Sequence, residues 1–197
     1  MVPVVNALDV GAYIYQRCGW VDAWSLEKLT YFVQAWHLAW DGRRLFDDEF
    51  EAWPAGPVVP KLHQVNKYDR PAVGGIFGTE LPGAKPQEIV GQSQLIVDAV
   101  LDFYSQHDRY TLIEMTHQDL PWKKARGDLN KHAKSNEVVT VSDMRRCYTS
   151  KMLNSDETVP AAPNLQPVSV SGGEPFQSAV DREIERWTQT LSLLAER

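Results

Sequence analysis

The sequence predicts a mainly α-helical protein with a small β element: a compact α+β domain followed by a tethered amphipathic helix. Three observations predict this architecture. Apolar residues recur at helical steps of three and four through most of residues 1–153. Prolines and glycines interrupt that pattern near residues 45–60, where the apolar spacing changes. Residues 154–173 then contain few core-forming side chains, which is typical of a linker, and a last helical pattern covers 174–197.

Size and composition restrict the class of protein further. The chain has 197 residues, and 43% of them are hydrophobic, which is enough to bury a core and excludes a wholly disordered chain. The net charge of −6 argues against general affinity for nucleic acid. No apolar run approaches a membrane span, and the start of the chain lacks the pattern of a signal peptide. Cys18 and Cys147 lie far apart. We therefore expect a cytoplasmic protein with no membrane partner.

The N-terminal part of the domain reads as two helices. Residues 7–18 form the first, which Gly19 ends. Ser25 stands at a suitable N-cap position for the second, which should end at Gly42. The tryptophans within residues 20–40 are expected at the centre of the core. The second helix should bury one face, formed by Leu26, Leu29, Val33, Trp36 and Trp40.

The middle of the chain changes direction sharply. Residues 45–53 are expected to form a short strand or extended turn, in which Trp53 packs against the Trp36 face. Gly56 then redirects the chain, and Pro57 is suited to the first position of another helix. Residues 71–86 read as a loop with a short hairpin around residues 75–78.

The rest of the domain is predicted to be helical. Pro86 restarts a helix that continues to Tyr104. The capping-box pattern Thr111-Leu-Ile-Glu114 predicts that a short helix begins at Thr111. Pro121 opens one more turn, and a last helix of the domain begins near Ser142.

The sequence contains no assembled group of catalytic or metal-binding residues. The five histidines show no pair at the spacing that puts two imidazoles on one helix face, so no metal and no cofactor are expected. His117 and Asp119 resemble a base with an orienting carboxylate. The favoured interpretation is that they end one helix, with Asp119 capping the turn at Pro121. No nucleophile elbow and no phosphate-binding loop is present, and no catalytic residue is assigned.

One run of basic residues stands beside Trp122. It has three interpretations: phosphate contacts with base stacking, a solvated helix end, or the positive half of an interface with an acidic partner. We regard nucleic acid as an unlikely partner because the chain as a whole is acidic. The run consists of Lys123, Lys124, Arg126, Lys131, His132 and Lys134.

The predicted helix over 174–197 requires a surface to cover its apolar stripe. It could dock on its own domain, lie in a groove of a partner protein, or join two copies of the chain as a homo-oligomer. The stripe consists of Phe176, Val180, Ile184, Trp187 and Leu191.

Three segments in order resemble the Panacea domain family, over about residues 7–153. The first runs from Leu26 to Trp36 and carries Lys28, Tyr31 and Trp36. The second is Glu51-Ala-Trp53-Pro-Ala-Gly56-Pro57-Val-Val-Pro60, which departs from the family at Ala55, where a tyrosine is common. The third is Thr116-His117-Gln-Asp-Leu-Pro121-Trp122.

The resemblance implies an antitoxin. Panacea-like domains are typically the neutralising partners in toxin–antitoxin systems of bacteria and prophages, and most are thought to bind the toxin directly. Their toxins include alarmone-synthetase-like enzymes, and the SocA-like branch delivers its toxin to a protease. We therefore expect a type II antitoxin that binds a cognate protein toxin, with the tail stripe, Lys123 and Lys124 as candidate contacts. The alternatives are a proteolytic adaptor, a DNA-binding autoregulator and an enzyme that reverses a toxin's modification.

Overall fold

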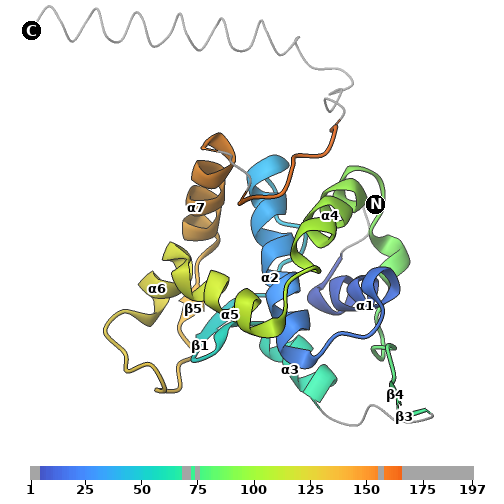
Figure 1. Cartoon of the computed structure of the whole chain (residues 1–197), viewed down its shortest axis with the longest axis horizontal. Helices are drawn as coiled ribbons and strands as arrows, with labels where there is room; N and C mark the ends of the chain where they lie inside the picture. The colour runs from blue at the N-terminus through green and yellow to red at the C-terminus, as the bar shows by residue number, and fades with distance from the viewer. Residues whose placement is uncertain (1–4, 68–71, 74–75, 155–157, 166–197) are drawn as a thin grey trace, which may run out of the picture. The chain divides into compact units, whose positions relative to one another are not determined.

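The computed structural model describes residues 5–67, 72–73, 76–154 and 158–165 (Figure 1). The chain divides into two units, Met1–Leu165 and Gln166–Arg197. The second unit, with the predicted tail helix and its stripe from Phe176 to Leu191, lies outside the described residues.

The described residues form seven α-helices and a small antiparallel sheet, so the predicted fold class, mainly α with a minor β element, is confirmed. The sheet has the strand order β2-β1-β5, and a separate two-stranded hairpin, β3-β4, lies within the predicted loop. The helices are α1 (Ala7–Cys18), α2 (Ala23–Trp40), α3 (Pro60–Lys67), α4 (Gly91–Tyr104), α5 (Arg109–Gln118), α6 (Leu120–Arg126) and α7 (Val141–Leu153). The strands are β1 (Phe50–Trp53), β2 (Gly56–Val58), β3 (Ala72–Val73), β4 (Ile76–Phe77) and β5 (Val138–Val139), and a 3₁₀ turn, η1, covers Pro86–Glu88.

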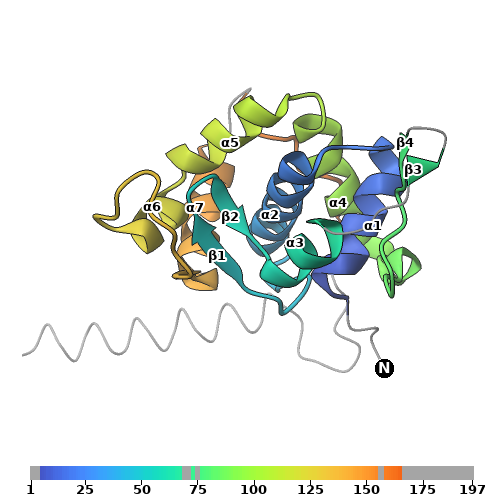
Figure 2. The same cartoon turned by 90° about the horizontal axis from the view of Figure 1, so that it is seen from below.

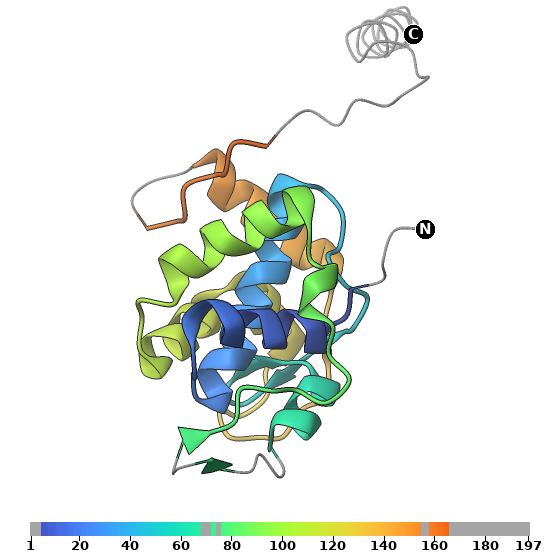
Figure 3. The same cartoon turned by 90° about the vertical axis from the view of Figure 1, so that its right-hand side faces the viewer.

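Helix α2 is the centre of the domain. It packs against α1, α4, α5 and α7, and against β2 of the sheet. Seen from below, it lies between β1 and β2 on one side and α1 and α4 on the other (Figure 2). Figure 3 shows α1 and α4 together on the side of α2 that faces the viewer. Because neighbours surround it, α2 is buried at every position from Ser25 to Leu38, and not along one face only.

Buried polar side chains of this helix form hydrogen bonds within the core. Gln34 donates to the carbonyl of Phe46 at 2.8 Å and accepts from the amide of Leu45 at 2.9 Å. The His37 ring lies 2.8 Å from the Arg43 carbonyl and 3.0 Å from the Ser93 hydroxyl. These bonds offset the cost of burying the polar groups, and they tie the connection after α2 to the core.

The tryptophans within residues 20–40 do not share one environment. Trp36 is completely buried, and its ring lies 5.2 Å from that of Tyr148 on α7. Trp20 and Trp24, however, are 47% and 49% exposed. The expectation that this group of tryptophans lies at the core centre is therefore confirmed for Trp36 and wrong for Trp20 and Trp24.

Two predicted helix starts are wrong because another residue provides the cap. Asp22, and not Ser25, caps α2, where its carboxylate accepts from the amides of Trp24 and Ser25. Asp108 caps α5 through the amide of Thr111, so the helix begins at Arg109. Aspartate caps as well as serine or threonine do, so the local pattern alone could not choose between the two positions.

Two predicted helices also begin later in the chain than expected. Pro57 lies in β2, paired with Ala52 of β1, and α3 begins at Pro60. Pro86 opens the turn η1, and α4 follows only from Gly91. In both places the chain first makes a tertiary contact or tight turn and then enters the helix.

Part of the predicted linker packs on the domain. In the described stretch 158–165, Pro160 is buried, and Val159 and Leu165 lie against the core. No helix within the described part of the chain is long and apolar enough to cross a membrane.

Candidate functional site

The first two segments that carry the family resemblance meet at Lys28. This side chain is completely buried on α2, and its ammonium donates to the carbonyl of Pro57 at 2.9 Å. Gly56, just before that proline, has a φ of +104°, which side chains with a Cβ rarely adopt. A Cβ there would lie 2.6 Å from the Thr116 hydroxyl and 2.8 Å from Lys28 Cε. The turn therefore needs glycine for its conformation and for its contact with Lys28 and Thr116.

Glu27 makes the neighbouring contact with the same turn. Its carboxylate accepts from the amide of Val59 at 3.2 Å and lies 3.7 Å from Nδ1 of His63 on α3. Burial raises the pKa of Glu27 to about 8, against the attraction of Lys28, and burial lowers the pKa of Lys28 to about 8, against that of Glu27. Through these hydrogen bonds the two side chains fasten the β1–β2 turn and the start of α3 to the central helix.

His117 and Asp119, considered as a base and its orienting carboxylate, point to different partners. The ring of His117 stacks on Trp122, with centroids 4.3 Å apart. Asp119 is buried and accepts from the hydroxyls of Tyr31, at 3.3 Å, and Tyr148, and from the ammonium of Lys151. The structure therefore does not assemble the two residues as a catalytic pair.

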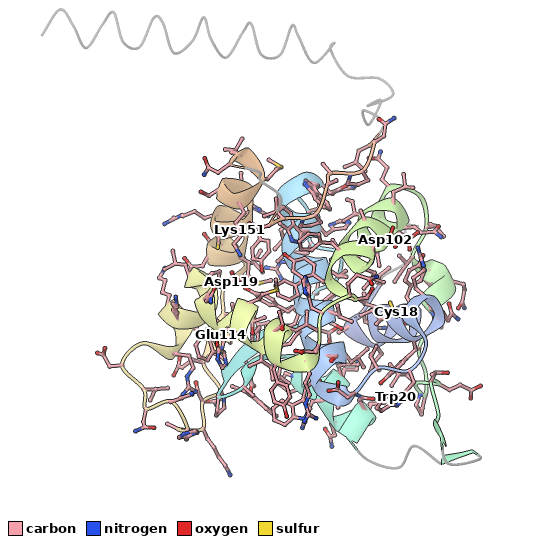
Figure 4. All side chains as sticks on the ribbon, viewed as in Figure 1. Cys18, Trp20, Asp102, Glu114, Asp119 and Lys151 are labelled. Carbon is pink, nitrogen blue, oxygen red and sulfur yellow. The ribbon has the colours of Figure 1, made fainter. Side chains whose placement is uncertain are left out.

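The prediction that Asp119 caps the turn at Pro121 is confirmed for its backbone but not for its side chain. Its backbone occupies the N-cap position of α6, but its side chain makes no capping hydrogen bond there. Burial and then the charge of Asp119 raise the pKa values of Tyr31 and Tyr148 well above 10, so both hydroxyls remain donors. Figure 4 shows Lys151 on α7 and Asp119 below it. The carboxylate joins α2, α6 and α7.

A pocket lies beside this network. Its volume is about 490 Å³, and its lining includes Phe32, Tyr104, Met115, Gln118 and Lys151. The side chain of Lys151 is 35% exposed, whereas that of Asp119 is 2% exposed. Lys151 thus covers the carboxylate on the solvent side.

The remaining motif residues hold α6 against the sheet. The indole N–H of Trp122 donates to the carbonyl of Trp53 at 3.0 Å, and Pro121 is buried. The expected contact of Trp53 with the Trp36 face is wrong. Trp53 instead lies 4.8 Å from the ring of His63 and donates to Glu51 at 2.7 Å. These contacts of the Trp53 side chain come from the strand itself and from α3.

The basic run divides between a structural and a surface role. Arg126 is buried, and its guanidinium donates to four carbonyls, those of Ala52, Ala133, Asn130 and Lys131. Lys123 and Lys124 lie in the last turn of α6, and Lys124 pairs with Asp143 at 2.7 Å. Within the described ranges no three His, Cys, Asp or Glu side chains are grouped so as to hold a metal ion.

The motif residues thus define a class of domain: a helical scaffold whose distinctive side chains fasten a turn and two helices to one central helix. Residues 26–123 match the family model described as antitoxin SocA-like, Panacea domain. These residues form a domain of this family, and the description supports an antitoxin role in general, with a toxin as partner. No curated protein and no solved structure matches the chain.

Proposed function

We propose that this chain is a type II antitoxin that neutralises a cognate protein toxin by direct, stoichiometric binding. The family match over residues 26–123 is the observation that carries the proposal. The contacts of the motif residues support it. Lys28 and Asp119 are buried and hydrogen-bonded to groups of their own domain, which suits a scaffold that presents surfaces to a partner.

Lys123 and Lys124 are the candidate toxin contacts on the domain itself. The side chain of Lys124 is 61% exposed in its pair with Asp143. An exposed pair of this kind is worth at most about 1 kcal/mol, so Lys124 can exchange Asp143 for a carboxylate of the toxin at little cost. The apolar stripe from Phe176 to Leu191 would supply the larger contact by lying in a groove of the toxin.

A truncation separates the tail from the scaffold. The cut should follow Leu165, because residues 158–165 pack on the domain and a cut at residue 153 would expose apolar surface. We expect the chain ending at Leu165 to remain folded and to lose the rescue of cells that co-express the toxin. The full chain with Phe176 and Trp187 changed to Ala should fail in the same way.

The outcome distinguishes the mechanisms. Undiminished rescue by the truncated chain would contradict the role of the tail. Rescue accompanied by disappearance of the toxin, and only in cells with an active protease, would indicate an adaptor instead of direct inhibition.

A further inference from the structure

Three large aromatic side chains among the described residues are exposed, although aromatic rings of this size normally contribute to a core. Trp20, Trp24 and Tyr110 are 47%, 49% and 66% exposed. Trp20 lies in the connection from α1 to α2, where Figure 4 labels it. Trp24 lies in the first turn of α2, and Tyr110 in the first turn of α5.

Arg109 lies at the start of α5, next to Tyr110. Its guanidinium lies 4.6 Å from the ring centroid of Tyr110 and donates to the hydroxyl of that residue at 2.6 Å. The bond to Tyr110 raises the pKa of Arg109 most, and the nearby charge of Asp22, the cap of α2, raises it further. Because α5 packs on α2, we treat Trp20, Trp24, Arg109 and Tyr110 as one surface, the aromatic patch.

The helix caps beside the patch are made by aspartates and not by aromatic residues. The start of α2 is stabilised by Asp22, which accepts from two amides, and the start of α5 by Asp108, which accepts from the amide of Thr111. Neither cap uses the rings. Trp, Tyr and Arg are, however, the residue types that contribute most of the binding energy at protein interfaces.

The charges around the patch indicate what a partner must offer. Asp22 and Asp108 already accept hydrogen bonds from their helix ends. Among the residues that the structure describes, no carboxylate lies within ion-pair distance of Arg109. A carboxylate of the partner would complement this guanidinium.

We propose that the aromatic patch is a docking surface for the protein toxin. The toxin places an apolar side chain against Trp20 and Trp24 and a carboxylate on Arg109. This inference rests on the proposed function and adds to it a contact surface on the folded domain, separate from the tail and from Lys123 and Lys124.

Arg109→Glu and Tyr110→Ala are the variants that test the patch. A glutamate at residue 109 stands in the first turn of α5, where the helix dipole favours a negative charge, so the fold should be unharmed. Leu153→Ala is the matched control, since Leu153 is 75% exposed and lies on α7. Thermal unfolding of each variant verifies that it is folded.

Affinity should be measured by titration calorimetry with the purified product of the reading frame adjacent to this chain's own. We expect each patch variant to bind at least roughly 30-fold more weakly, as for an interface hot spot, and the control to bind normally. Normal binding of the toxin by both patch variants would overturn the proposal. It would also be overturned if the patch variants no longer formed a dimer of this chain but bound the toxin with unchanged affinity. Absence of binding by the unaltered chain would instead contradict the proposed function itself.

Discussion

Gly56→Ala tests whether the β1–β2 turn is held by its contact with Lys28 and Thr116. The substitution places a Cβ at a φ of +104°, 2.6 Å from Thr116 Oγ1 and 2.8 Å from Lys28 Cε. Lys28 cannot move aside easily, because it is completely buried and bonded to Pro57. Strain of this backbone costs about 1–3 kcal/mol, and overpacking a tight core adds about 1–3 kcal/mol. The free energy of unfolding should therefore fall by about 2–6 kcal/mol.

Gly83→Ala is the matched control for this substitution. Gly83 has a φ of +80°, but a Cβ there meets nothing within 4 Å. It should cost only the backbone strain, about 1–3 kcal/mol. Urea unfolding monitored by tryptophan fluorescence gives both free energies. If the two variants lose the same free energy of unfolding, within about 0.5 kcal/mol, the loss reflects backbone strain alone. That result would refute the argument that contact with Lys28 and Thr116 requires glycine at residue 56.

Two further predictions concern the buried charges. Asp119→Ala leaves the hydroxyls of Tyr31 and Tyr148 and the ammonium of Lys151 without their acceptor. The free energy of unfolding should therefore fall by about 3–5 kcal/mol. A loss of less than about 1 kcal/mol, measured by urea unfolding, would contradict this prediction. The second concerns Glu27, whose pKa rises from 4.5 in the unfolded chain to about 8 in the folded chain. Between these two pH values, folding is therefore accompanied by the uptake of a proton. Stability should fall with rising pH by at most about 1.4 kcal/mol per pH unit. Glu27→Gln should therefore gain stability relative to the original chain across that window, and parallel pH profiles would contradict the assignment.

The sequence predicts the helical elements well where one local signal is unambiguous. The apolar steps through Leu29, Val33 and Trp36 identify α2, and Gly19 ends α1 as expected. Prediction fails where two residues are equally suitable, as with Asp22 and Ser25 for the cap of α2. It also fails at Pro57, which suits a helix start as well as a strand edge and is fixed in β2 by pairing with Ala52.

The contacts of the motif residues could not be predicted, because they join distant parts of the chain. Tyr31 and Asp119 are separated by 88 residues, and Lys28 and Pro57 by 29. Tyr148 and Lys151, spaced three apart and so on one face of α7, were the available signal for a partner of Asp119. The exposure of Trp20 and Trp24 was missed for a different reason: a tryptophan indicates a large contact area but not how much of that area the folded chain covers.

The direct test of the central claim is a titration of toxin activity with purified antitoxin. Inhibition by stoichiometric binding predicts a linear fall in activity that reaches completion at a fixed molar ratio near equality, together with a stable complex of the two proteins. Complete recovery of toxin targets at far below equimolar antitoxin, with no complex formed, would contradict the account and favour an enzyme that reverses the toxin's modification.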